Sequence, residues 1–237
     1  MKRTTSLGSD LVTRFAAILA LVSLYGDLLA TEKPSPRPLI LFEENFEAGL
    51  GQLWKEVSFH GRTQYEIIHE GTNSALKATA GNSASGLALK IKVTTRPRVY
   101  FRWRWKIERV PEGSTDTDIK SFDHAARVFV VFKSGLGPPR TLNYVWSNQL
   151  QINDTFRHPT SGRSRFVVLE TGNERAGQWI TETRDIIADW KRLFLDEAPL
   201  TIEAVGLMTD SDGTGTIVHG FYDDISFFRR PESGATD

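Results

Sequence analysis

Short apolar runs recur along the chain between Leu39 and Phe228, separated by clusters of Gly, Pro, Asn, Asp and Ser. Runs of this length with turn residues between them are typical of β-strands, and a long series of them predicts two packed sheets. We therefore predict an all-β fold, a two-sheet jelly-roll-like sandwich. The eleven expected strands are Leu39–Phe46, Trp54–Phe59, Tyr65–His69, Ala75–Ala80, Leu87–Val93, Val99–Ile107, Ala126–Phe132, Leu142–Trp146, Phe166–Glu170, Ile202–Met208 and Gly220–Phe228.

The segment Phe101–Ile107 shows the clearest strand pattern. It reads FRWRWKI, with apolar and cationic residues in strict alternation. Successive side chains of a strand point to opposite faces, so the aromatic residues share one face and the cations share the other. The apolar face of this segment is expected to lie in the core.

One helix is expected among the strands, at Thr183–Leu195. Its apolar residues follow helical spacing, which predicts a stripe directed toward the sandwich. The members of that stripe are Ile186, Ile187, Trp190, Leu193 and Phe194. Two polar, Gly- and Pro-containing segments, Pro111–Phe122 and Gly135–Arg140, are expected to be loops. We predict a single domain over residues 39–230, followed by a flexible tail at 231–237.

The first 30 residues have the pattern of a secretory signal peptide. Basic residues precede the uncharged run Phe15–Tyr25, and a small residue, Ala30, marks the expected cleavage point. The run is shorter than the ~20 residues that cross a bilayer, so we expect no membrane span after cleavage. Residues 31–38 contain three prolines and are expected to form a tether. The predicted location is the bacterial periplasm or the medium.

Composition narrows the function classes. The chain has no cysteine and equal numbers of basic and acidic residues, 29 of each. Without cysteine there is no disulfide framework, no thiol nucleophile and no thiolate metal site. A net charge of zero gives no electrostatic reason to expect nucleic acid as a partner. Oligomeric state is left open.

Acidic residues mark the two ends of the last strand pair, which is expected to be a β-hairpin. They are Asp210 and Asp212 in the turn and Asp223 and Asp224 in the final strand. Carboxylates are unusual in strands unless they are paired or bind a metal ion. One interpretation is a structural calcium ion that joins the first strand to the last, held by Glu43, Glu44, Asp223 and Asp224. The alternative is that these are edge charges that oppose aggregation.

A second polar cluster is predicted around Arg127, which opens the apolar strand Val128–Phe132. A guanidinium at this position needs a carboxylate, and Asp123, Asp210 and Asp212 are the candidates. We expect these four residues to converge. The cluster is either a ligand site in a groove or a structural ion pair. His124, beside Asp123, is a further candidate as an acid–base group.

Tyr144 and Trp146 are the predicted aromatic platforms for a ligand, because they share a strand face and lead into the polar run Ser147–Gln149. No nucleophile elbow, P-loop or dinucleotide fingerprint is present in the sequence. Scattered histidines without HxH or HExxH spacing argue against a zinc site.

Several motifs together resemble one bacterial family, the domain of unknown function 3047. They are FHGRTQYEI, SASGL, WRW, DHAARVFVVF, LNYVW, the residues around the helix, GLMTDSDGTG and YDDISF, in this order. The resemblance spans about Phe42 to Phe228 and implies an exported single-domain protein, with no catalytic residues to carry over. This chain departs from the family pattern at three places: His124 replaces the second residue of an acidic pair, Asp185 replaces an asparagine before the helix, and Leu195 replaces a glycine after the helix.

The resulting hypothesis is a sandwich like those of carbohydrate-binding modules and lectins, binding a glycan or another cell-envelope ligand without transforming it. Two alternatives stay open. One is a glycan-active hydrolase or lyase that uses the cluster around Arg127, and the other is a structural envelope protein. No cofactor is expected beyond the calcium ion.

Overall fold

The computed structural model describes residues 37–133, 137–197 and 201–231. The predicted signal peptide, most of the predicted tether, and the tail after residue 231 lie outside the described residues, as does part of the loop expected at 135–140. These assignments stay predictions.

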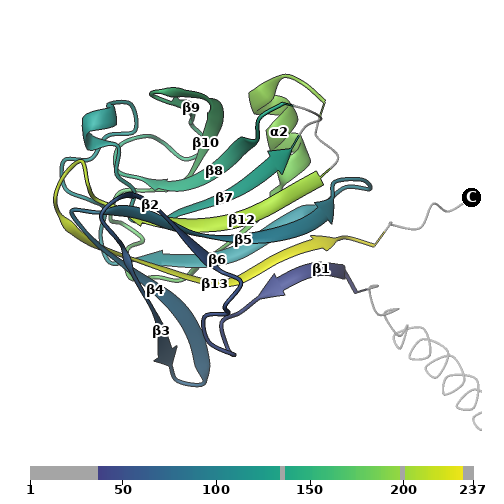
Figure 1. Cartoon of the computed structure of the whole chain (residues 1–237), viewed down its shortest axis with the longest axis horizontal. Helices are drawn as coiled ribbons and strands as arrows, with labels where there is room; N and C mark the ends of the chain where they lie inside the picture. The colour runs from purple at the N-terminus through teal and green to yellow at the C-terminus, as the bar shows by residue number, and fades with distance from the viewer. Residues whose placement is uncertain (1–36, 134–136, 198–200, 232–237) are drawn as a thin grey trace, which may run out of the picture. The chain divides into compact units, whose positions relative to one another are not determined.

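Two sheets pack face to face as a sandwich, which confirms the predicted fold class (Figure 1). The six-stranded sheet has the order β11-β6-β13-β4-β3, with β1 also paired to β13. Its strands are β1 (Leu39–Glu44), β3 (Gln64–Glu70), β4 (Asn73–Gly81), β6 (Tyr100–Ile107), β11 (Ile180–Asp185) and β13 (Ile217–Arg229). The seven-stranded sheet has the order β2-β5-β12-β7-β8-β10-β9. Its strands are β2 (Lys55–His60), β5 (Ala84–Thr94), β7 (Arg127–Lys133), β8 (Arg140–Ser147), β9 (Thr155–His158), β10 (Ser161–Thr171) and β12 (Thr201–Asp210).

Each of the eleven predicted strands corresponds to an observed one, with ends that differ by a few residues, whereas β9 and β11 were not predicted. β9 is four residues long and reads TFRH, and β11 reads ITETRD. Neither contains the apolar run by which the other strands were recognised. Both are edge strands, where one row of backbone groups has no neighbour and tertiary pairing decides the structure.

The expected hairpin between the last two strands is wrong. β12 pairs with β5 and β7, whereas β13 pairs with β1, β4 and β6 in the other sheet. The acidic segment after Asp210 therefore carries the chain from one sheet to the other. This crossing places Asp210 and Asp212 at one sheet and Asp223 and Asp224 at the other.

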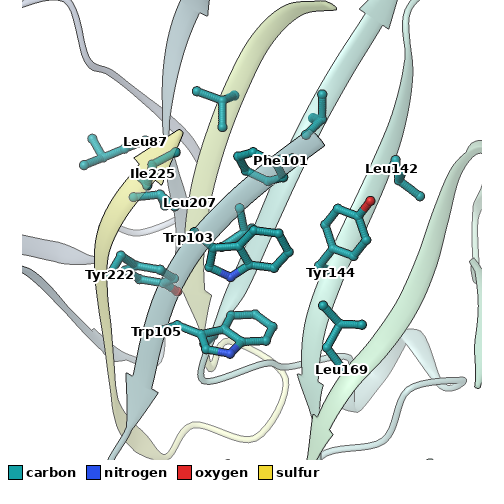
Figure 2. Packing of buried hydrophobic residues seen from close by; sticks show 14 of the residues in the cluster. Leu87, Phe101, Trp103, Trp105, Leu142, Tyr144, Leu169, Leu207, Tyr222 and Ile225 are labelled. Atoms are coloured by element: carbon teal, nitrogen blue, oxygen red, sulfur yellow. The ribbon is translucent and has the colours of Figure 1, made fainter. Parts of the chain in front are cut away.

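The core is built on the apolar face of β6. Phe101, Trp103, Trp105 and Ile107 are fully buried, while Arg102 is exposed, as the alternation predicts. Figure 2 shows the two indole rings directed toward Tyr144 and Leu169 of the opposite sheet. The ring centroids of Trp103 and Tyr144 are 5.0 Å apart. These contacts join the two sheets.

Helix α2 (Ile186–Phe194) lies within the range predicted for it, and the residues before it belong to β11. Asp185 caps the helix, because its carboxylate accepts hydrogen bonds from the backbone N–H groups of Ile187 and Ala188. Leu195 ends it in a left-handed conformation, with φ at 56°. Glycine favours that region, so the glycine that the family resemblance leads us to expect here would adopt it with less strain than leucine. Within the described residues, no helix has the length and apolar character to cross a membrane.

Glu182 is an unusual residue in β11, because it faces the core beside Trp103, its partner across the β6–β11 ladder. Burial, together with the negative charge of nearby Glu170, raises the pKa of Glu182 to about 7. Glu170 is itself buried and pairs with Arg175. The folded protein therefore holds the Glu182 proton more tightly than the unfolded chain does.

Replacing Trp103 by alanine should destabilise the protein by about 3–5 kcal/mol, the range for aromatic truncation in a core. Arg102→Ala, on the solvent face of the same strand, should cost less than about 1 kcal/mol. Arg104 is not a suitable control, since it pairs with the fully buried Asp223. Chemical denaturation measures both free energies, and equal losses at positions 102 and 103 would contradict the assignment of the two faces.

Replacing Glu182 by glutamine should raise the melting temperature at pH 8 and change it little at pH 5. A pKa raised on folding means that stability falls as pH rises from about 4.5 toward 7, and the neutral amide removes that loss. Thermal melts at the two pH values test this, with Glu112→Gln, at an exposed position, as the control. The same shift at both pH values would show that Glu182 does not titrate in this range.

Candidate functional site: a groove on the seven-stranded sheet

The outer face of the seven-stranded sheet carries the candidate site. Along β7, Val128 and Val130 are fully buried in the core, so Arg127 and Phe129 point to the other face. The same alternation in β8 directs Leu142 and Tyr144 inward and leaves Asn143 on the outer face. The chemistry of this face is therefore set by residues that do not build the core.

A groove of about 350 Å³ lies on this face and is lined by strands β2, β5, β7, β8, β9, β10 and β12 and the segment around Phe122. This volume is at the lower end of the range for small-molecule sites. Aromatic and imidazole rings form much of its lining: Phe59, Phe122, Phe129, His158 and Phe166. Phe59 is 71% exposed, so most of its ring is open to solvent beside the groove.

Phe129 is laid across the neighbouring strand β12. Gly206 is its direct partner in the β7–β12 ladder, and a Cβ added there would lie 2.1 Å from the Cζ atom of Phe129. Only glycine leaves this space, so the ring can lie down on the sheet and turn a face toward the groove. The neighbouring outward positions on β5 are also small, Ala84 and Gly86, so the floor of the groove is shallow.

Arg127 and Asp210 form the polar end of the groove. The Arg127 side chain is 9% exposed and that of Asp210 is 4% exposed, and Nη2 of Arg127 lies 3.5 Å from Oδ2 of Asp210. The same guanidinium contacts the sulfur of Met208. Its Nε–H is buried and has no hydrogen-bond partner within the part of the chain that the structure describes. The expectation that Arg127 is buried and paired with a carboxylate is therefore confirmed.

Asp123, Asp210 and Asp212 each place a carboxylate oxygen within 4.8 Å of the other two. Asp123, before β7, therefore lies close to Asp210, the last residue of β12, and to Asp212 just after it. Asp123 accepts hydrogen bonds from the N–H groups of Gly213 and Thr214, at 3.1 and 2.6 Å. These bonds dock the acidic segment against the start of β7. Asp210 and Asp212 line the groove.

Oxygen ligands at this spacing are those a hard divalent cation takes. Two features compete with such an ion: the Arg127 guanidinium beside Asp210, and the backbone donors that already occupy Asp123. The three carboxylates therefore form a polar cluster in which the Arg127 guanidinium supplies the positive charge.

Burial raises the pKa of Asp210, although the charge of Arg127 lowers it. Burial also raises the pKa of Asp212, and the negative charge of Asp123 adds to this effect. The pKa of His158 is lowered, which disfavours the cationic form of its ring. Burial lowers its pKa, and the positive charge of Arg127 lowers it further. The His158 ring is therefore neutral at pH 7.

The structure places His124 behind the groove. Its side chain is 1% exposed, and Nε2 lies 3.0 Å from Oδ1 of Asp116. Asp116 in turn accepts a hydrogen bond of 2.6 Å from Ser147. This buried chain ties the loop before β7 to the end of β8. His124 is thus not an accessible acid–base group, which corrects the sequence-based expectation.

Tyr144 and Trp146 cannot be ligand platforms, because both are fully buried between the sheets. The hydroxyl of Tyr144 donates to Asp189 at 3.0 Å, and the indole N–H of Trp146 donates to the carbonyl of Gly172 at 2.9 Å. Their polar atoms are satisfied inside the protein. The face they share is the core face of β8, opposite the groove.

The proposed calcium ligands do not come together as a group. Glu44 accepts hydrogen bonds from the N–H of Phe46 and the indole of Trp54. Asp223 is fully buried and bound by Arg104, which also lies 3.1 Å from Asp224. A guanidinium thus supplies the positive charge that a calcium ion was expected to provide. Glu43 is an exposed residue of β1.

Sequence reasoning missed the groove aromatics and Asn143. The strand around Phe129 reads RVFVVFK and is apolar on both faces, so period-two alternation cannot assign its sides. A usable signal was present in β8, where Thr141 and Asn143 alternate with Leu142 and Tyr144. That alternation places the polar pair outside and the tyrosine inside.

Comparisons with known proteins identify the family. Residues 52–226 match the family model described as "Protein of unknown function (DUF3047)", which confirms the resemblance seen in the motifs. Comparison with curated proteins gives no match.

The fold is also similar to solved structures. A xylan-binding CBM22-1 domain from Paenibacillus barcinonensis Xyn10C is 13% identical, with a TM-score of 0.43, over 84% of this chain and 99% of that chain. A family 11 carbohydrate-binding module of Lic26A-Cel5E from Clostridium thermocellum is 12% identical, with a TM-score of 0.43, over 82% and 95%. The cellulose induced protein Cip1 is 15% identical, with a TM-score of 0.43, over 78% and 96%. What the groove binds has to be inferred from its own residues.

The Arg127–Asp210 pair can be tested by a double-mutant cycle. Arg127→Met should destabilise the protein by about 3–5 kcal/mol at pH 7, because it leaves a buried carboxylate without its cation. Adding Asp210→Asn should restore most of that loss. The cost of Arg127→Met should shrink as the pH falls, because burial raises the pKa of Asp210 and protonation removes its unpaired charge. If chemical denaturation gives equal losses of unfolding free energy in Arg127→Met and in the double variant, the two residues are not a coupled pair.

Proposed function

The chain belongs to the DUF3047 family, and we propose that it is an exported protein that binds a glycan without transforming it. The binding site is the groove on the outer face of the seven-stranded sheet. One observation carries the proposal: exposed or half-exposed aromatic rings and planar polar side chains line the same shallow groove.

This pairing of groups matches the chemistry of a sugar. Each sugar ring has an apolar face of C–H groups, which packs on an aromatic face, and a rim of hydroxyls, which donate and accept hydrogen bonds. Phe59 and Phe129 supply ring surface. Arg127, Asp212 and Asn143 supply donors and acceptors on the same floor.

The expected location agrees with this function. The signal-peptide pattern at residues 1–30 would deliver the domain to the periplasm or the medium, where cell-envelope and environmental glycans occur. Phe59 is a large exposed ring in a groove that also carries polar side chains. Phe59 therefore favours binding over a purely structural role.

A glycan-active hydrolase or lyase is the second candidate, and one observation favours it. The two groove carboxylates, Asp210 and Asp212, have raised pKa values and lie close together, as an acid–base pair would. Against this, Asp210 is bound by Arg127 and by the backbone N–H of His124. New reducing ends or unsaturated products, released by the wild-type protein and absent with Asp212→Asn, would establish the enzyme.

The proposed function predicts that Phe59→Ala weakens glycan binding by roughly tenfold without a change in stability. A polysaccharide array first identifies the strongest ligand, and titration calorimetry then gives its Kd for each variant. Because Phe59 is 71% exposed, its loss should leave the melting temperature unchanged. Phe129→Ala should weaken binding at least as much.

Leu53→Ala is the matched control, since Leu53 is 76% exposed and does not line the groove. It should bind as the wild type does. An array without any bound glycan, using protein that melts cooperatively, would refute the proposed function. So would binding that survives the loss of both phenylalanine rings.

A further inference from the structure

We propose that the groove selects uncharged sugar chains and rejects chains that carry carboxylate or sulfate groups. The inference rests on the proposed function and goes beyond it by naming the chemical class of the ligand. It follows from the charges that line the groove, the partners of those charges and the shape of the floor.

The charge in the groove is unbalanced toward the negative side. Among the described residues that line it, Arg127 is the one side chain with a permanent positive charge, against the carboxylates of Asp210 and Asp212. Asp123 adds a third carboxylate within 4.8 Å of both. His158, the remaining titratable group of the lining, is half-buried beside the charge of Arg127 and contributes no cation at pH 7.

Arg127, the one permanently charged cation among the described residues of the groove, already has a carboxylate partner. Arg127 is 3.5 Å from Asp210, and both side chains are at least nine-tenths buried. An anionic sugar would compete with Asp210 for the guanidinium and would leave a buried carboxylate unpaired, which is costly. A hydroxyl has no such effect, because it carries no charge that would draw the guanidinium away from Asp210.

Asp212 places the excess negative charge where a ligand meets it. It is exposed, it lines the groove, and Asp123 lies beside it. As an acceptor without a bound cation, it favours a ligand hydroxyl that donates and repels a ligand carboxylate. Two like charges a few ångströms apart repel each other even in water, and more strongly in a partly dry groove. A ligand carboxylate beside Asp212 therefore binds more weakly than a hydroxyl.

The floor indicates how the chain lies. Phe129 lies over Gly206, and the outward-facing residues Ala84 and Gly86 of β5 have small side chains. A floor of this kind accepts a flat ring without a steric barrier. The aromatic ring then favours sugars with a flat C–H face, and the acidic end of the groove disfavours sugars that carry a negative charge.

The test uses an array of neutral polysaccharides, such as xylan, mannan, galactan and mixed-linkage β-glucan, beside polygalacturonate, alginate and hyaluronan. It is read once in EDTA and once with added calcium. We expect binding to neutral polymers only, in both conditions. Binding to uronate polymers, with or without calcium, would overturn the inference while leaving glycan binding intact. An array without any binding would refute the proposed function itself.

A second measurement isolates the charge. The best neutral polymer that carries primary hydroxyls is compared with the same polymer after those hydroxyls are oxidised to carboxylates. At low ionic strength the oxidised form should bind at least about tenfold more weakly, and added salt should narrow this gap. Asp212→Asn should reduce the ratio of the neutral-polymer affinity to the oxidised-polymer affinity by about fivefold.

Glu43→Gln, an exposed carboxylate on the other sheet, is the matched control and should leave that ratio unchanged. The ratio of affinities is independent of any general weakening that a variant causes. An oxidised polymer that binds as tightly as its neutral parent, or a ratio that Asp212→Asn does not move, would contradict selection by charge.

Discussion

Burial of the aromatic face of β6 is the interaction on which the rest of the structure depends. Trp103 and Trp105 fill the space between the sheets and contact Tyr144 and Trp146 of the opposite sheet. Because the inner faces are committed to this core, the outer face of the seven-stranded sheet is free to carry polar and exposed aromatic residues. Truncating the core aromatics would loosen the sheet that holds the groove residues in place.

Charge imposes the second constraint. A guanidinium enters the apolar strand β7 and needs a carboxylate, which the chain supplies from a point 83 residues later. The pairing of Arg127 with Asp210 links the start of β7 to the end of β12, where the chain leaves one sheet for the other. A requirement for stability thus brings carboxylates, a guanidinium and the Phe129 ring to one place. In the proposed function, the groove uses the same residues for recognition.

The two acidic clusters illustrate how similar residues serve different purposes. Asp223 and Arg104 form a buried pair on the six-stranded sheet, where the carboxylate is fully enclosed. Asp212, in contrast, is exposed and lines the groove. Exposure, not residue type, distinguishes the structural carboxylate from the one that a ligand can reach.

Local pattern determined much of the fold. The period-two alternation of Phe101–Ile107 assigned the core face of β6, and turn residues between apolar runs located eleven strands. It also predicted the convergence of Asp123, Arg127, Asp210 and Asp212, because the energetic need of a buried guanidinium is independent of topology.

Tertiary structure decided the rest. Whether β12 and β13 pair as a hairpin or belong to separate sheets depends on hydrogen bonds to distant strands, which local pattern does not encode. The side of Tyr144 and of Phe129 depended on which face of a strand meets the opposite sheet. The sequence by itself thus determined the strands, the core face of β6 and the need for the ion pair. Only the packing of two sheets decided which residues face the groove, because burial is a property of the neighbours that folding brings together.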